Sequence, residues 1–110
     1  MKLSELIQNL KLESAYPILH DPEITTGYTS DLLSDVMANA KEGCVLITIQ
    51  AHKNTVAVAG LVQASAILIC NGRNIPEDMI EAAKAEKIAL LKIKLNQYQA
   101  SIQLYQSIKA

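Results

Sequence analysis

The chain begins with apolar positions at helical spacing and then passes into shorter blocks typical of strands. The helical spacing covers residues 3–10 and predicts a surface helix with Ser4 as its N-cap. A short edge strand is expected at residues 12–16, followed by a loop at residues 18–23. The next block, residues 24–28, is rich in β-branched and aromatic side chains and predicts the first core strand.

The remainder of the chain alternates strand-like apolar blocks with helical blocks. Three blocks that are nearly continuous in apolar residues predict strands of a parallel sheet covered on both faces, at residues 44–49, 66–70 and 88–93. Helices are expected before, between and after these strands, and three of them have expected N-caps, Ser34, Asn54 and Asn96. This alternation predicts an α/β fold with a mainly parallel sheet of about four to five strands covered by helices. We expect one domain over residues 1–110.

Two of the predicted helices have unusual surfaces. The helix at residues 55–63 is apolar nearly all round, so it must be covered on more than one side, either by the rest of the fold or by a second subunit. The last helix carries an amphipathic stripe made by Tyr98, Ile102 and Tyr105, flanked by Leu104 and Ile108.

Composition narrows the range of partners. The four aromatic residues are all tyrosine and the formal net charge is -1, so neither base stacking nor attraction to phosphate backbones is expected. No apolar run is as long as the stretch of about 20 residues that spans a bilayer, and the amino terminus lacks a signal-peptide pattern. We therefore expect a cytoplasmic protein that binds neither nucleic acid nor membranes. Cys44 and Cys70 have no CxxC spacing and are expected to be buried free thiols.

The candidate chemistry lies in the loops that follow the predicted strands. Ligands of open parallel sheets bind beyond the carboxyl ends of the strands, where backbone N–H groups can hold a phosphate or carboxylate. The candidate ligand-binding residues at this edge are Ser30, Asp31, Gln50, His52, Asn54, Asn71 and Gly72, with Lys53, Arg73 and Lys94 nearby. The competing interpretation is that the asparagines only cap helices.

No catalytic motif accompanies these loops. The glycines at 27, 43, 60 and 72 are too scattered for a GxxxxGK[ST] or GxGxxG phosphate loop, so kinase activity is not expected. Asp31 and His52 could act as a base with its orienting carboxylate, which keeps a small enzyme as an alternative to an exposed loop histidine. No spacing of carboxylates or histidines indicates a metal site, and no cofactor is expected.

One continuous region resembles a known family. Asp21-Pro22-Glu23-Ile24-Thr25-Thr26-Gly27-Tyr28, leading into residues 30–40, resembles a stand-alone DRTGG domain. Further segments fit the same pattern, at residues 43–50, 52–54, 56–61, 66–72 and 104–105, so the resemblance covers about residues 1–108. Pro22 follows Asp21 where the family motif has arginine, and Thr26 replaces its first glycine. A function that depends on that arginine is therefore not carried over.

The resemblance implies a three-layer α/β domain related to the N-terminal domain of HPr kinase. Such domains are attached to CBS-domain pyrophosphatases and to phosphotransacetylases, where they look regulatory or subunit-pairing. We therefore expect a non-enzymatic regulatory or protein-interaction module that forms a homodimer and senses a small anionic metabolite or nucleotide at the strand ends. The alternatives are an accessory subunit of a redox or hydrogenase-type system, and the small enzyme that would use Asp31 and His52.

Overall fold

A mainly parallel sheet forms the centre of the computed structural model, which describes residues 1–109. Its five strands are β1 (Glu13–Ser14), β2 (Thr26–Thr29), β3 (Cys44–Thr48), β4 (Ala66–Ile69) and β5 (Ala89–Lys92). They lie in the order β1-β5-β4-β3-β2, with β2 to β5 parallel and β1 antiparallel to β5. The predicted fold class is confirmed.

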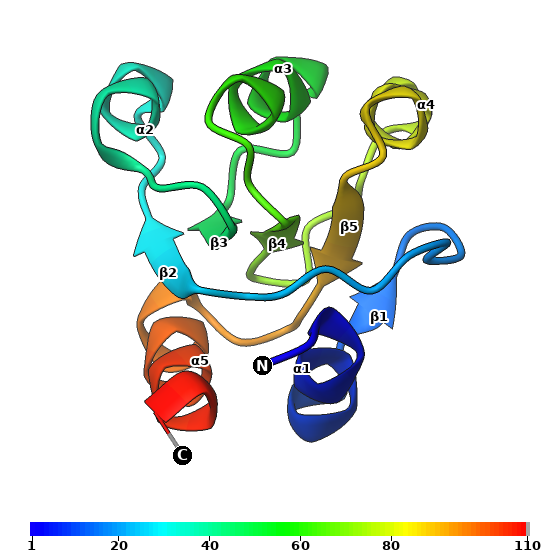
Figure 1. The fold of residues 1–110 in the computed structure, drawn as a ribbon. Helices are drawn as coiled ribbons and strands as arrows, with labels where there is room; N and C mark the ends of the chain where they lie inside the picture. The colour runs from blue at the N-terminus through cyan, green and yellow to red at the C-terminus, as the bar shows by residue number, and fades with distance from the viewer. Residues whose placement is uncertain (110) are drawn as a thin grey trace.

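Helices cover both faces of the sheet and make three layers (Figure 1). On one face lie α2 (Leu33–Asn39), α3 (Lys53–Leu61) and α4 (Glu77–Glu86), and on the other lie α1 (Leu3–Leu10) and α5 (Gln97–Lys109). The parallel strands follow one another across the sheet in chain order, so each crossover of the same hand returns its helix to the same face. The chain after β5 instead crosses to the opposite face, where α5 packs on β2 and β3.

The sheet separates two apolar clusters. Every residue of β3 and β4 is buried, as the continuous apolar blocks predict. Alternate side chains point to opposite faces, so Ile47 belongs to the cluster under α1 and α5, whereas Leu46 belongs to the cluster under α2, α3 and α4. Cys44 and Cys70 are buried free thiols, as predicted. Burial, together with the nearby charge of Asp31, raises the pKa of Cys70 to about 11.

The fold itself covers most of α3. This helix lies between α2 and α4 over the sheet (Figure 1). Val56, Val58 and Ala59 are buried, whereas Leu61 is 72% exposed. The apolar surface of α3 therefore gives no reason to expect a second subunit on the face of the sheet that α2, α3 and α4 cover.

The predicted N-cap of the first helix is wrong because α1 begins at Leu3, with Lys2 at the cap position. Ser4 lies inside the helix, where its hydroxyl donates to Asp21 Oδ2 at 2.6 Å and its amide donates to Asp21 Oδ1 at 2.8 Å. A carboxylate from a distant loop therefore satisfies the amide that a local cap would have served.

Two further predicted N-caps are wrong and one is confirmed. The first turns of α2 and α3 close on the carbonyl oxygens of Leu32 and His52, so Ser34 and Asn54 lie within the helices. Asn96 is a cap, since its Oδ1 accepts the amide of Gln99 at 2.9 Å. A residue type that favours the N-cap position therefore does not by itself show where a helix begins.

The strand predicted at residues 24–28 is shifted and lies elsewhere in the sheet. The structure has β2 at Thr26–Thr29, and the strand is at the edge of the sheet rather than in its core. Ile24, expected within the strand, is buried in the segment that precedes it. Because β2 is an edge strand, one side of it remains without a neighbouring strand within residues 1–109.

Candidate functional site

The loops after β2, β3, β4 and β5 lie at one edge of the sheet, as the parallel pairing requires. The predicted ligand-binding residues all fall in or beside these loops: Ser30, Asp31, Gln50, His52, Asn54, Asn71 and Gly72. Whether this edge can bind an anion depends on which of its hydrogen-bonding groups remain available.

The carboxylate of Asp31 joins three separate segments of the chain. Its Oδ1 accepts hydrogen bonds from Thr48 Oγ1 at 2.8 Å, from the Ile49 amide at 2.9 Å and from Gln97 Nε2 at 3.0 Å. Thr48 ends β3 and is fully buried, and Gln97 is the first residue of α5. Asp31 therefore ties the loop after β2 to the end of β3 and to the start of α5.

Backbone groups expected to hold an anion are also used within the protein. The amides of Asn71 and Gly72 donate to the carbonyl oxygens of Leu95 and Ile93, both at 2.9 Å. These bonds join the loop after β4 to the loop after β5. Both residues have positive φ, 62° for Asn71 and 59° for Gly72, which orients the turn for this pairing.

Ser30, Gln50 and the residues at the start of α3 have local structural roles or lie exposed. The Ser30 hydroxyl accepts a hydrogen bond from the backbone amide of Leu32 at 3.2 Å, and the backbone amide of Gln50 donates to Thr48 Oγ1 at 3.2 Å. His52 is the N-cap position of α3 and is exposed, as is Asn54 in the first turn. Within residues 1–109 no hydrogen bond joins His52 to Asp31, so the geometry of a base and its orienting carboxylate is not formed there.

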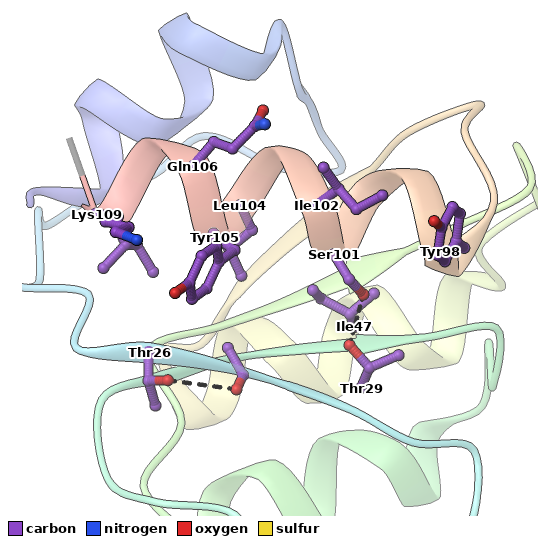
Figure 2. A pocket seen from close by; sticks show the side chains of 12 residues that line it. Thr26, Thr29, Ile47, Tyr98, Ser101, Ile102, Leu104, Tyr105, Gln106 and Lys109 are labelled. Carbon is purple, nitrogen blue, oxygen red and sulfur yellow. Dashed lines mark hydrogen bonds between the residues drawn. The ribbon is translucent and has the colours of Figure 1, made fainter.

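A groove with a volume of about 890 Å³ lies between α5 and β2. Figure 2 shows it running along α5, with Thr29 and Ser101 facing each other across it. We call it the α5–β2 groove; its lining residues include Thr26, Gly27, Thr29, Tyr98, Ile102 and Tyr105. The sequence shows the α5 residues as one stripe but does not show that they face this groove.

The helix divides the predicted stripe into a buried and an exposed part. Leu104 is 2% exposed and lies over β2, whereas Tyr98 is 75%, Ile102 is 40% and Tyr105 is 65% exposed. The buried part packs closely, because a Cβ atom built on Gly27 would lie 2.4 Å from Leu104 Cδ2. Three large side chains of α5 lie exposed beside the edge of β2 that has no neighbouring strand within residues 1–109.

The chemistry available in the α5–β2 groove is that of binding rather than proton transfer. Among its described lining residues, Lys109 is the one side chain charged at neutral pH, and the hydroxyls of Thr29 and Ser101 bond each other at 2.7 Å. Apolar surface rimmed by a few hydroxyls is typical of an interaction site. Within residues 1–109, no group of three or more histidines, cysteines or carboxylates is placed to hold a metal ion. No helix in the same range is long and apolar enough to cross a membrane.

Comparison with known proteins identifies the fold. No family model matches the chain, and no curated protein matches it. Among solved structures it is similar to the CBS and DRTGG domains of the regulatory region of Clostridium perfringens pyrophosphatase, complexed with the activator diadenosine tetraphosphate. The TM-score is 0.74 at 17% identity, over 96% of this chain and 46% of that chain. The DRTGG-like fold expected from the sequence is confirmed, and this likeness concerns the fold alone.

Proposed function

We propose that the chain is a non-enzymatic regulatory module that works by pairing with a second copy of itself through the α5–β2 groove. The observation that carries the proposal is the row of exposed side chains on α5, Tyr98, Ile102 and Tyr105, beside the open edge of β2. The similar solved structure is a regulatory region complexed with a nucleotide activator, which supports a regulatory role.

The chemistry of this surface favours a protein partner. Tyrosines supply large contact areas with little loss of side-chain entropy and are enriched where binding energy concentrates. The open edge of β2 offers backbone groups that a strand can pair with. A twofold axis beside β2 would bring these same features together from both copies, and a stable interface needs about 800 Å² from each partner.

Replacing one exposed tyrosine tests the pairing. We expect the wild-type chain to sediment as a dimer at about 10 μM, and Tyr105→Asp to weaken dimerisation by about thirtyfold or more, since a hot-spot side chain contributes about 2 kcal/mol. Lys109 lies 5.5 Å from the Tyr105 ring, so the new carboxylate has a cation beside it and the folded monomer tolerates it. Analytical ultracentrifugation over a concentration series measures the effect.

Leu61→Asp is the matched control. Leu61 is 72% exposed against 65% for Tyr105, but it lies on α3 at the opposite face of the sheet. We expect this variant to dimerise as the wild type does. A wild-type chain that stays monomeric, or an equal loss of dimer in both variants, would contradict pairing through the α5–β2 groove.

A further inference from the structure

A second groove lies where the end of α1 meets the end of β5. Its volume is about 560 Å³, within the range of about 300–1,000 Å³ typical of small-molecule sites. Its described lining residues are Asn9, Leu10, Lys11, Glu13, Gly72, Lys92, Ile93, Lys94, Leu95 and Gln103. We call it the lysine groove, after Lys11, Lys92 and Lys94.

The lysine groove concentrates positive charge on a chain that carries a small negative charge overall. Its three lysines and one glutamate leave a net charge of +2, whereas the whole chain has a formal net charge of -1. Glu13 lies directly opposite Lys92 in the β1–β5 ladder, so it offsets that lysine most closely. Within residues 1–109, Lys11, Lys92 and Lys94 form no salt bridge.

Residues distant in sequence create this arrangement. Lys11 follows α1 and has a left-handed backbone with φ 54°, while Lys92 ends β5 and Lys94 follows it. The antiparallel pairing of β1 with β5 brings these two regions side by side. The side-chain amides of Asn9 and Gln103, also on the lining, can donate further hydrogen bonds to an oxygen-rich ligand.

We propose that the lysine groove binds a small soluble polyphosphate, such as the triphosphate of a nucleotide. Three lysines on the lining of one groove match a ligand with several negative charges in a row, and each lysine ammonium offers three donors to phosphate oxygens. A singly charged carboxylate would satisfy only part of this charge. The lysine groove and the α5–β2 groove share no lining residue, so this proposal is independent of pairing.

Titration of the ¹⁵N-labelled chain with inorganic triphosphate, followed by amide chemical shifts, tests the proposal. We expect saturable shifts below about 1 mM ligand, concentrated at residues 92–95 and at Gly72. Lys94→Gln should weaken binding about fivefold, because one charge contact is lost. Glu13→Gln should tighten binding by a similar factor, a gain that a merely structural role for the carboxylate does not predict.

Lys41→Gln is the control. Lys41 precedes β3 and so lies at the amino ends of the parallel strands, whereas Lys92 and Lys94 lie at the carboxyl end of β5. Unchanged affinity in this variant, together with opposite effects of Lys94→Gln and Glu13→Gln, would establish the site. Shifts spread evenly over all lysines, no saturation, or co-sedimentation with vesicles containing phosphoinositide in preference to binding free triphosphate would overturn it. Triphosphate binding that persists in Tyr105→Asp separates this site from the pairing surface.

Discussion

Asp31→Ala is expected to lower the free energy of unfolding by about 3 kcal/mol or more, because one hydrogen bond to a charged group contributes about 1.5–3 kcal/mol and three such bonds are lost together. The substitution leaves the hydroxyl of buried Thr48 and the amide of Ile49 without their acceptor. It also releases Gln97, the first residue of α5. Urea unfolding followed by circular dichroism measures the change.

Asp31→Asn is the matched control for this experiment. The amide keeps an oxygen at the position of Oδ1, so the three donors retain an acceptor while the charge is removed. We expect a cost of about 1 kcal/mol, the difference between charge-assisted and neutral hydrogen bonds. If Asp31→Ala left stability unchanged, the carboxylate would be free for the ligand-binding role that the sequence indicated, and its structural role would be wrong.

The role of Asp31 connects the carboxyl edge of the sheet to the α5–β2 groove. Asp31 accepts a hydrogen bond from the Gln97 side chain and so fixes the point at which α5 begins after the chain has crossed from β5. The same helix is held farther along by Thr29, whose hydroxyl donates to Ser101 at 2.7 Å because the Ser101 hydroxyl itself donates to the Gln97 carbonyl. Polar residues that resemble a ligand site in the sequence therefore position α5, the helix that lines the α5–β2 groove.

The elements that could be predicted are those whose own residues determine them. β3 and β4 are buried on both faces, so their side chains must be apolar at nearly every position, and the sequence shows this directly. The cap at Asn96 was also predictable, because its partner, the Gln99 amide, is three residues away. Periodicity and hydrogen bonds between nearby residues can be predicted from a short stretch of sequence.

Features that depend on distant partners could not be predicted. The Asp31–Gln97 bond joins residues 66 positions apart, and the Ser4–Asp21 bonds replace a local cap by a loop carboxylate. The sequence also does not reveal that this face of α5 is exposed, because apolar residues at helical spacing normally indicate the buried side of a helix. The lysine groove requires the pairing of β1 with β5, which no local pattern specifies.

Gly27→Ala is expected to destabilise the chain by about 1–3 kcal/mol, the usual cost of forcing an extra methyl group into a packed core. The new Cβ atom would lie 2.4 Å from Leu104 Cδ2 and 3.7 Å from Ile47 Cδ1. Leu104 is 2% exposed, so its side chain cannot turn away into solvent. Either α5 moves away from β2 or the leucine adopts a strained rotamer, and thermal unfolding reports the loss.

Gly60→Ala provides a control of opposite sign. Gly60 lies in α3, where alanine is favoured over glycine by about 0.5–1 kcal/mol, and the atom nearest to its new methyl group would belong to the exposed Glu86 carboxylate, at 3.3 Å. We expect this variant to be as stable as the wild type or more so. Equal destabilisation by both alanines would refute the close approach of α5 to β2 as the cause.

A double-mutant cycle with Leu104→Ala isolates the contact between α5 and β2. Leu104→Ala alone should cost about 2–5 kcal/mol because it leaves a cavity in the core. That cavity lies where the Gly27→Ala methyl group would enter, so the second substitution should cost little once the first is present. We therefore expect the double variant to be more stable than the sum of the single effects predicts, by about 1 kcal/mol or more. Strict additivity would show that the two residues do not meet, and that the floor of the α5–β2 groove is built differently.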